Sequence, residues 1–451
     1  MTDPAMASPA ETGRPVTTAE VGSSERGRPT TLLPIGQLIR LSAYWLGLTA
    51  IDAAVGQFVS NRLNFHGIVQ DLEVGRAQAV VGLGGAIIGI VIQPTVGTIS
   101  DYAVTRWGRR KPFIVFGSLL DVVFLFGLAS SNSVLMLAVF VALLSFSTNI
   151  ARGPFQGYVP DLIAAPQVGM ASALVGLMQI LGNVTGYLLV TIGITLGQAP
   201  LSVMAVAVVE LVTMVSVVYR VSPGRPPRSR NGRSWGAIAA EAWGTDILRE
   251  HSYLWLLGSR LFFLMGGAVL VNLSQTYLKQ VHHMDESGAA TTFVVLLAVV
   301  AVGNLLAAIP ASRLSDRIGR KPIIYAACLL GGVGVSIAAL APSVATAIGG
   351  VALFGVSAGM FLSVDWALMT DIIPNAAAGR YMGLSNVATG ASTPIGVAIG
   401  GVVLDAVNQA MGLGTGPRIA FLVGAGFYVV AAILLRPVDP RRREERSASA
   451  G

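Results

Sequence analysis

The chain has 451 residues, of which 53% are hydrophobic and only 12% are charged, and its formal net charge is +7. A soluble protein of this length would need more charge, and its apolar segments would stop well short of the about 20 residues that cross a bilayer. We therefore expect a protein embedded in a lipid bilayer. The positive charge does not indicate nucleic-acid binding, because the cations are neither interleaved with aromatic residues nor gathered in a compact basic domain.

The first segment, residues 1–33, is rich in Pro, Ser and Thr and carries charges of both signs. It has no apolar core followed by a small-residue cleavage site, so it does not resemble a signal peptide. We expect a disordered cytoplasmic tail there and a second cytoplasmic tail over 437–451.

Long apolar segments recur along the rest of the chain, and they predict an all-α membrane protein. We expect twelve transmembrane helices, at 35–58, 77–98, 113–130, 133–157, 170–194, 199–219, 253–275, 289–311, 323–341, 345–369, 382–404 and 417–435. Six would form an N-terminal half over 34–220 and six a C-terminal half over 253–436. The segment between them, 221–252, contains SPGRPPRSRNGRS, which is typical of a linker, and then a helix-like pattern that suits the membrane interface.

The loop cations define an orientation. They gather in alternate loops, at Arg106 to Lys111, Arg220 to Arg233, Arg313 to Lys321 and Arg436 to Arg446, whereas the other loops hold only Arg62, Arg76, Lys279 and Arg418. Since cytoplasmic loops carry an excess of Lys and Arg, we expect a multi-pass protein of the cell membrane with both termini in the cytoplasm.

Two motifs occur once in each half. GTISDYAVTRWGRRKP follows the second span and ASRLSDRIGRKP follows the eighth, so that Asp101 and Arg109 correspond to Asp316 and Arg320. DLIAAPQVG after the fourth span, starting at Asp161, matches DIIPNAAAG after the tenth, starting at Asp371. Two matches in the same order indicate duplicated halves, which in transporters enclose a site at their interface.

Two roles are open for the cations of the repeated loop. They hold the loop on the cytoplasmic side. In addition, Arg109 and Arg320 can act as latches that pair with acids at neighbouring helix ends, and Asp161 and Asp371 are the candidates.

These loops resemble the GxLxDRxGRKP signature of the major facilitator superfamily. The longer Asp-to-Gly spacing of the first copy is similar to that of the glycoside-pentoside-hexuronide cation symporters and the sucrose transporters, and GPFQGYVPDL and ILGNVTGY resemble the fourth and fifth helices of the sucrose group. YWLGLTAID is similar to the first helix of melibiose permeases, where the Asp matching Asp52 contacts sugar. The resemblance implies two six-helix halves that work by alternating access on a sugar.

The chain departs from these relatives at two positions. Gln156 stands where plant-type sucrose symporters carry Arg, and Arg152 stands where melibiose permeases carry the Asp of their cation site. A sodium site of that kind is therefore not expected. Gln156 and Asp365 are, with Asp52 and Tyr44, the candidates for binding the substrate or a proton.

Ionisable residues within the spans are expected to face the interior of the bundle, because exposure to lipid costs a few kcal/mol. Asp52 lies near the middle of the first span, where it either binds substrate or a proton or pairs with a cation. Tyr44 precedes it by eight residues, so we expect both on one face, with Tyr44 offering an aromatic surface to a sugar ring. Asp121 and Glu210 are interpreted as stabilisers inside the bundle.

Opposite charges occur late in two equivalent spans, at Arg152 in the fourth and Asp365 in the tenth. We expect these two to pair as an inner gate, with Arg260 as a competing partner for Asp365.

The sequence thus predicts a secondary transporter, namely a proton-coupled symporter of a sugar, a glycoside or a similar small polar solute, acting as a monomer. The alternative in transport is a proton-driven exporter of a drug or metabolite, although the fifth span has LGNVTG instead of the Gly-Pro-x-x-Gly-Gly pattern of the superfamily's antiporters. A sensor or scaffold would need a soluble effector domain. No catalytic set, metal-ligand cluster or phosphate-binding loop is recognisable, so neither an enzyme nor a cofactor is expected.

Overall fold

The computed structural model describes residues 32–221, 229–230, 232–240, 251–372 and 378–439 of the chain, and all regular structure in these ranges is helical. Among the described residues, twelve helices are long and apolar enough to cross a membrane, which confirms the expected number of spans. The elements are α1 (Ile35–Phe65), α2 (Val74–Ser100), α3 (Lys111–Ala129), α4 (Val134–Gln156), α5 (Tyr158–Leu162), η1 (Ala165–Gln167), α6 (Val168–Thr195), α7 (Ala199–Arg220), α8 (Trp235–Ala240), α9 (His251–Asn272), α10 (Ser274–His282), α11 (Glu286–Ile318), α12 (Arg320–Leu340), α13 (Val344–Ile372), α14 (Ala378–Met411) and α15 (Thr415–Leu435).

Several helices continue beyond the apolar segments that predicted them, because polar turns at their ends lower the local hydropathy. The helices α1, α11 and α14 have 31, 33 and 34 residues. The seventh span, in contrast, is divided at Leu273 into α9 and α10. On either side of the break the side chains of Asn272 and Ser274 donate to the carbonyls of Ala268 and Leu270, which competes with the regular helical bonds.

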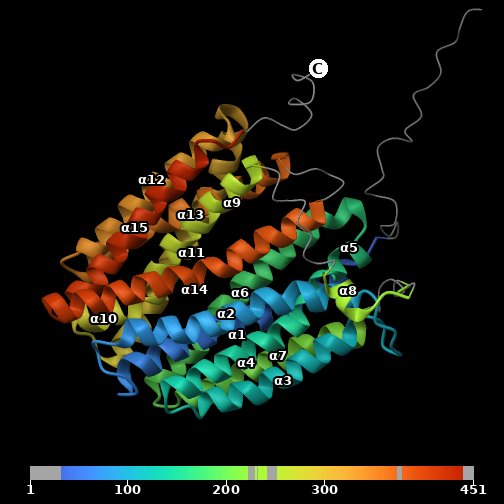
Figure 1. Cartoon of the computed structure of the whole chain (residues 1–451), viewed down its shortest axis with the longest axis horizontal. Coiled ribbons are helices and arrows are strands. Elements are labelled where there is room, and N and C mark those ends of the chain that lie inside the picture. Colours follow the sequence, from blue (N-terminus) through green and yellow to red (C-terminus); the bar gives the residue numbers. More distant parts are fainter. Residues whose placement is uncertain (1–31, 222–228, 231, 241–250, 373–377, 440–451) are drawn as a thin grey trace, which may run out of the picture.

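The helices pack as two bundles with repeated contacts. In the first half α1 packs against α6 and α7, and α4 packs against α2 and α3; in the second half α9 packs against α14 and α15, and α13 packs against α11 and α12. Figure 1 shows the two groups of helices, with α14 beside α2 where they meet. The identical pairing pattern is the structural counterpart of the repeated motifs.

Each half has its own apolar core. One cluster of buried residues lies within 253–438, and two others lie almost entirely within 38–221. Large apolar side chains such as Leu135, Val212, Leu305 and Leu329 are instead more than 60% exposed. Contact with hydrocarbon explains this exposure in a chain with twelve spans.

The loops define two ends of the bundle. We call the end that carries the α2–α3 and α11–α12 loops the basic end, and the end that carries the α1–α2, α10–α11 and α14–α15 loops the opposite end. At the basic end Gly108 and Gly319 both have φ = 94°, a conformation that glycine adopts readily. The sharp turns expected from the repeated motif are therefore present in both halves.

The part of the linker that is described contacts the first half at the basic end. Arg233 donates a 2.6 Å hydrogen bond to the Tyr102 hydroxyl, and its guanidinium lies 5.2 Å from the centre of that ring. The first residues of the segment expected to form an interfacial helix form α8, and the rest of that segment, 241–250, lies outside the described residues.

Candidate functional site

The first intramembrane ion pair joins α1 to α4. Arg152 Nη2 lies 2.5 Å from Asp52 Oδ2, and the two side chains are 18% and 51% exposed. The Asp52 carboxylate thus combines a direct cationic partner with a large accessible surface near the middle of a spanning helix. An acid that faced lipid in this way would be costly, so this surface belongs to the polar interior of the bundle.

The second intramembrane pair joins α9 to α13. The Arg260 guanidinium contacts the Asp365 carboxylate, and both side chains are buried, at 8% and 1% exposure. Arg260 also donates through Nε to Thr389 on α14 at 3.1 Å, and it lies 5.7 Å from the centre of the Trp366 ring. This pair is enclosed by protein, unlike the first.

The expected pairing of Arg152 with Asp365 is wrong. Each residue pairs inside its own half, Arg152 with Asp52 and Asp365 with Arg260. Arg260, which the sequence offered as the competing partner for Asp365, is therefore its partner in the structure. A charge in a low-dielectric region needs an opposite charge within a few ångströms, and the first and fourth helices of each half supply one. Because α1 and α4 correspond to α9 and α13, the two halves carry equivalent pairs with the signs reversed.

Tyr44 does not share the face of Asp52, and its expected role as a surface for a sugar ring is wrong. Its side chain is fully buried, donates towards Glu210 on α7, shares a 2.6 Å hydrogen bond with Ser118 on α3 and packs edge-on against Phe155. Eight residues make 2.2 turns of a helix, which rotates Tyr44 by about 80° relative to Asp52. That rotation turns the ring into the packed side of α1.

Gln156 lies one helical turn after Arg152 on α4 and is partly exposed. Its Oε1 accepts a 3.1 Å hydrogen bond from Gln93 Nε2 on α2. The α4 face that carries Arg152 therefore continues as a polar surface towards the basic end.

At the basic end the expected contact between Arg109 and Asp161 is present, at 2.5 Å. Arg110 joins it: its Nε lies 2.8 Å from Asp161, its Nη2 lies 2.9 Å from Asp101, and its Nη1 donates to the Pro154 carbonyl at 2.8 Å. We call Asp101, Arg109, Arg110 and Asp161 the basic-end network. It ties the α2–α3 loop to the ends of α4 and α5.

Arg110 was not among the residues predicted to form this contact, although its position beside Arg109 was the available signal in the sequence. The guanidinium occupies the space above Gly157, where an added Cβ would lie 1.6 Å from Arg110 Nη1. Burial raises the pKa of the neighbouring Tyr158 phenol above its ordinary value.

The corresponding network in the second half is described only in part. Arg320 Nη1 lies 3.5 Å from Asp316 Oδ1, one turn away across the α11–α12 junction. The side chain of Asp371 lies outside the described residues, so the expected latch between Arg320 and Asp371 stays a prediction.

At the opposite end a carboxylate of the second half binds the start of a helix in the first half. Asp405 on α14 is buried and accepts hydrogen bonds from the backbone N–H groups of Gly75, at 2.9 Å, and Arg76, at 2.6 Å, in the first turn of α2. The backbones approach closely here, because a Cβ added to Gly75 would lie 2.1 Å from the Gly401 carbonyl oxygen. Asp405 was not predicted as a functional residue, because the expected eleventh span, 382–404, ends just before Asp405.

Further polar contacts join the halves at the same end. Lys279 pairs with Asp71 at 2.6 Å and also donates to the Asn64 carbonyl, while His66 lies 3.1 Å from Glu286. The polar contacts between the two bundles that we find among the described residues all belong to this end. The two halves are therefore fastened together at the opposite end.

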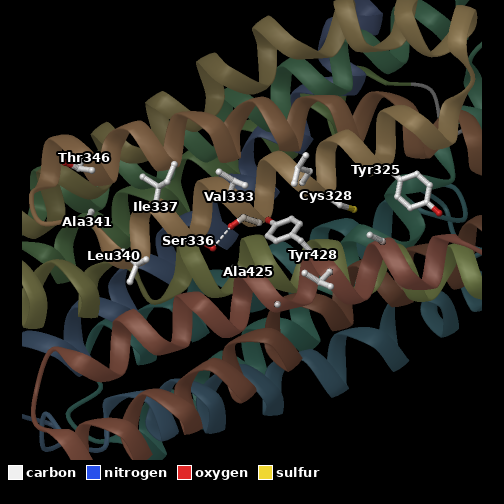
Figure 2. A pocket seen from close by; sticks show the side chains of 15 residues that line it. Tyr325, Cys328, Val333, Ser336, Ile337, Leu340, Ala341, Thr346, Ala425 and Tyr428 are labelled. Carbon is white, nitrogen blue, oxygen red and sulfur yellow. Dashed lines mark hydrogen bonds between the residues drawn. The ribbon is translucent and has the colours of Figure 1, made fainter.

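A separate groove of about 820 Å³ lies in the second half between α12 and α15 (Figure 2). Its walls are mainly apolar, with Val333, Leu340 and Val429 among the lining residues. The Ser336 hydroxyl in its wall already donates to the Gly332 carbonyl. The groove suits hydrocarbon and not a polar solute, which needs free hydrogen-bonding partners.

Known proteins resemble the chain in sequence and in fold. It is 34% identical over 127 residues to the general alpha-glucoside permease of Schizosaccharomyces pombe, covering 25% of this chain and 23% of the permease. It is 28% identical over 142 residues to the sucrose transport protein SUC3 of Arabidopsis thaliana, covering 26% of this chain and 24% of the relative. The chain thus aligns with about a quarter of the length of these relatives.

Solved structures match over most of the chain. A bacterial homologue of the human lysosomal transporter Spinster, in an inward-facing and unoccupied conformation, superposes with a TM-score of 0.70 at 14% identity, covering 90% of this chain and 96% of that one. A D-xylose-proton symporter superposes with a TM-score of 0.67 at 15% identity, covering 89% and 97%. These relatives are membrane transporters and not enzymes. The sequence model of the Major Facilitator Superfamily matches residues 41–306 and 287–451, and the chain belongs to that superfamily.

Proposed function

We propose that this superfamily transporter is a proton-coupled symporter that imports a sugar, a glycoside or a similar small polar solute. The observation that carries the proposal is the Asp52–Arg152 pair, in which a carboxylate near the middle of a span is half-exposed yet bonded to a guanidinium. The sugar permeases among its relatives and the xylose-proton symporter among its structural neighbours support the substrate class and the coupling ion.

The proposed coupling follows from the charge of this pair. While Asp52 is ionised it holds Arg152, and the net charge of the pair is zero. A proton that binds Asp52 removes the attraction and frees the Arg152 guanidinium to donate hydrogen bonds to solute hydroxyls. Solute binding and protonation therefore favour each other, and reciprocity of coupling requires that each strengthens the other equally.

The second half contributes in a different way. Asp365 and Arg260 are enclosed, and Arg260 also reaches Thr389 on α14. We assign Asp365 to the solute pathway as the residue that fixes Arg260 between α13 and α14. On the first half, Gln156 and Gln93 provide the polar side chains that line this pathway.

We further propose that the basic end faces the cytoplasm, with both termini on that side, and that the protein acts as a monomer in the cell membrane. Positive loops favour this orientation. With the halves fastened at the opposite end, the conformation is inward-facing. Transport then requires the 34–220 and 253–436 halves to rock, so that the opposite end opens and the basic end closes. The basic-end network and its counterpart at Asp316, Arg320 and Asp371 hold the loops within each half during this movement.

The test uses the purified protein in proteoliposomes. An inward proton gradient should drive accumulation of labelled sucrose or an α-glucoside, and addition of the sugar should alkalise the outer medium. A variant with Asp52→Asn should abolish both signals but retain counterflow of sugar down its gradient. Accumulation that persists without a proton gradient, or sugar-independent exchange of protons for a cationic dye, would instead support the exporter.

A further inference from the structure

Two carboxyl groups lie together inside the first half, apart from the ion pairs described above. Asp121 on α3 and Glu210 on α7 are both fully buried. The two carboxyl groups lie close enough to interact with each other directly. Neither takes part in the ion pairs found among the described residues.

Hydroxyl groups donate hydrogen bonds to one oxygen of each carboxyl. Asp121 Oδ1 accepts hydrogen bonds from Ser147 and from Thr148, the latter at 2.9 Å, and Glu210 Oε1 accepts one from the Tyr44 hydroxyl at 3.4 Å. The other oxygens, Asp121 Oδ2 and Glu210 Oε2, are buried and receive no donor from the surrounding groups. Each carboxyl thus has one oxygen that is buried and accepts no hydrogen bond.

One proton bound by the two carboxyls would pair the buried oxygens and remove one of two like charges. An ionised carboxyl is acceptor-only, so these two buried oxygens can be paired with each other only if one of the carboxyls carries a hydrogen. Two carboxylates in contact also cannot both be ionised in a low-dielectric interior, because like charges at that distance repel strongly. We propose that Asp121 and Glu210 form a proton-binding site that holds one proton between the two carboxyl groups at neutral pH.

A metal cation fits less well. A metal ion ligated by both carboxyls would need several further oxygen ligands around it. The neighbouring hydroxyls of Ser147 and Thr148 instead donate hydrogen bonds to Asp121, and Ser147 also to a carbonyl of its own helix.

The titratable and charged groups that face this site come from the two other helices packed against it. The phenol of Tyr44 reaches it from α1, and the guanidinium of Arg152 acts on it electrostatically from α4. Thr148, a donor to Asp121, lies one helical turn before Arg152. With one proton the site has a charge of −1 that attracts Arg152, and without it the charge is −2. The proton therefore weakens the hold of the site on the cation that pairs with Asp52.

The experiment is infrared spectroscopy of the purified full chain at neutral and alkaline pH. The parent should show the carbonyl-stretch band of a protonated carboxyl at neutral pH, shifted in heavy water and lost at alkaline pH. Glu210→Gln and Asp121→Asn should each abolish the band, because the amide donates its own N–H to the remaining carboxylate. Asp161→Asn is the matched control: Asp161 is buried but bonded to two guanidinium groups, so its loss should leave the band unchanged.

Thermal unfolding gives a second readout. The parent should melt at lower temperature as the pH rises, since proton loss leaves two like charges buried together, and Glu210→Gln should remove most of that decrease. A parent without the band, or a band that persists in both amide variants, overturns the proposal. Sodium that raises the melting temperature of the parent at fixed pH and ionic strength, but not that of Glu210→Gln, would also overturn it in favour of a metal site. The parent's own spectrum decides the matter if both amide variants fail to fold.

Discussion

Replacing Asp405 with Asn should open the opposite end of the transporter. The carboxylate accepts two backbone hydrogen bonds from the first turn of α2, one on each oxygen. Asn offers a single acceptor oxygen and turns an NH₂ group towards the second N–H, so at least one bond is lost. The negative charge that favours a helix N-terminus is lost as well.

The magnitude follows from these two losses. A hydrogen bond to a charged group contributes about 1.5–3 kcal/mol. The charge at the helix N-terminus adds about 0.3–1 kcal/mol. At about 1.4 kcal/mol per factor of ten, the equilibrium between the closed and open opposite end should shift roughly twentyfold to several hundredfold towards the open form.

Distances between spin labels can measure this shift. Asn132 and Met411 are exposed, lie at the opposite end and belong to different halves, while the native Cys328 is only 4% exposed and should remain unlabelled. The distance distribution should move to longer values in the Asp405→Asn variant. Asp71→Asn is the matched control, because that acid also bridges the halves but is 44% exposed and forms a weaker, solvent-screened pair.

Two results would refute the reasoning. One is a distance distribution in the Asp405→Asn variant that matches the parent. The other is an equal shift in the Asp71→Asn variant, which would mean that any charge removed at this end opens it.

Four further outcomes are expected. Asp365→Asn should lower the melting temperature more than Asp52→Asn, because it leaves Arg260 buried and unpaired, at a cost of about 3–5 kcal/mol for a fully buried pair, whereas Arg152 keeps access to water. Equal melting temperatures would contradict the difference in enclosure. The exchanged variant Asp52→Arg with Arg152→Asp should recover part of the transport lost in Asp52→Arg alone; a double variant no better than the worse single one would argue against direct pairing. Arg110→Lys should impair transport while orientation in the membrane is retained, because an ammonium group cannot reproduce the three contacts of this guanidinium. Gly157→Ala should have a similar effect by displacing the Arg110 guanidinium, and normal uptake by both of these variants would restrict the loop cations to orientation.

The sequence by itself determined the spans and the duplication. A spanning helix depends on apolar length, which is a local property of composition, and the described part of the chain contains twelve such helices. The repeated motifs indicated equivalent halves, and the same helix pairings occur in both. The contact between Arg109 and Asp161 could also be predicted from the sequence, because Arg109 lies in a short loop and Asp161 in the short helix α5, at neighbouring helix ends where few partners compete.

Only the tertiary structure decided which side chains meet inside the bundle. Opposite charges on the fourth and tenth helices suggested a pair, yet Arg152 and Asp365 each bind a residue of their own half. Tyr44 and Asp52 differ by about 80° around α1, enough to bury one and expose the other. Partner choice depends on the rotation of each helix and on its neighbours, and neither is encoded in the hydropathy of a span. For the same reason the meeting of Asp121 with Glu210, and of Asp405 with the start of α2, became visible only when the helices were packed together.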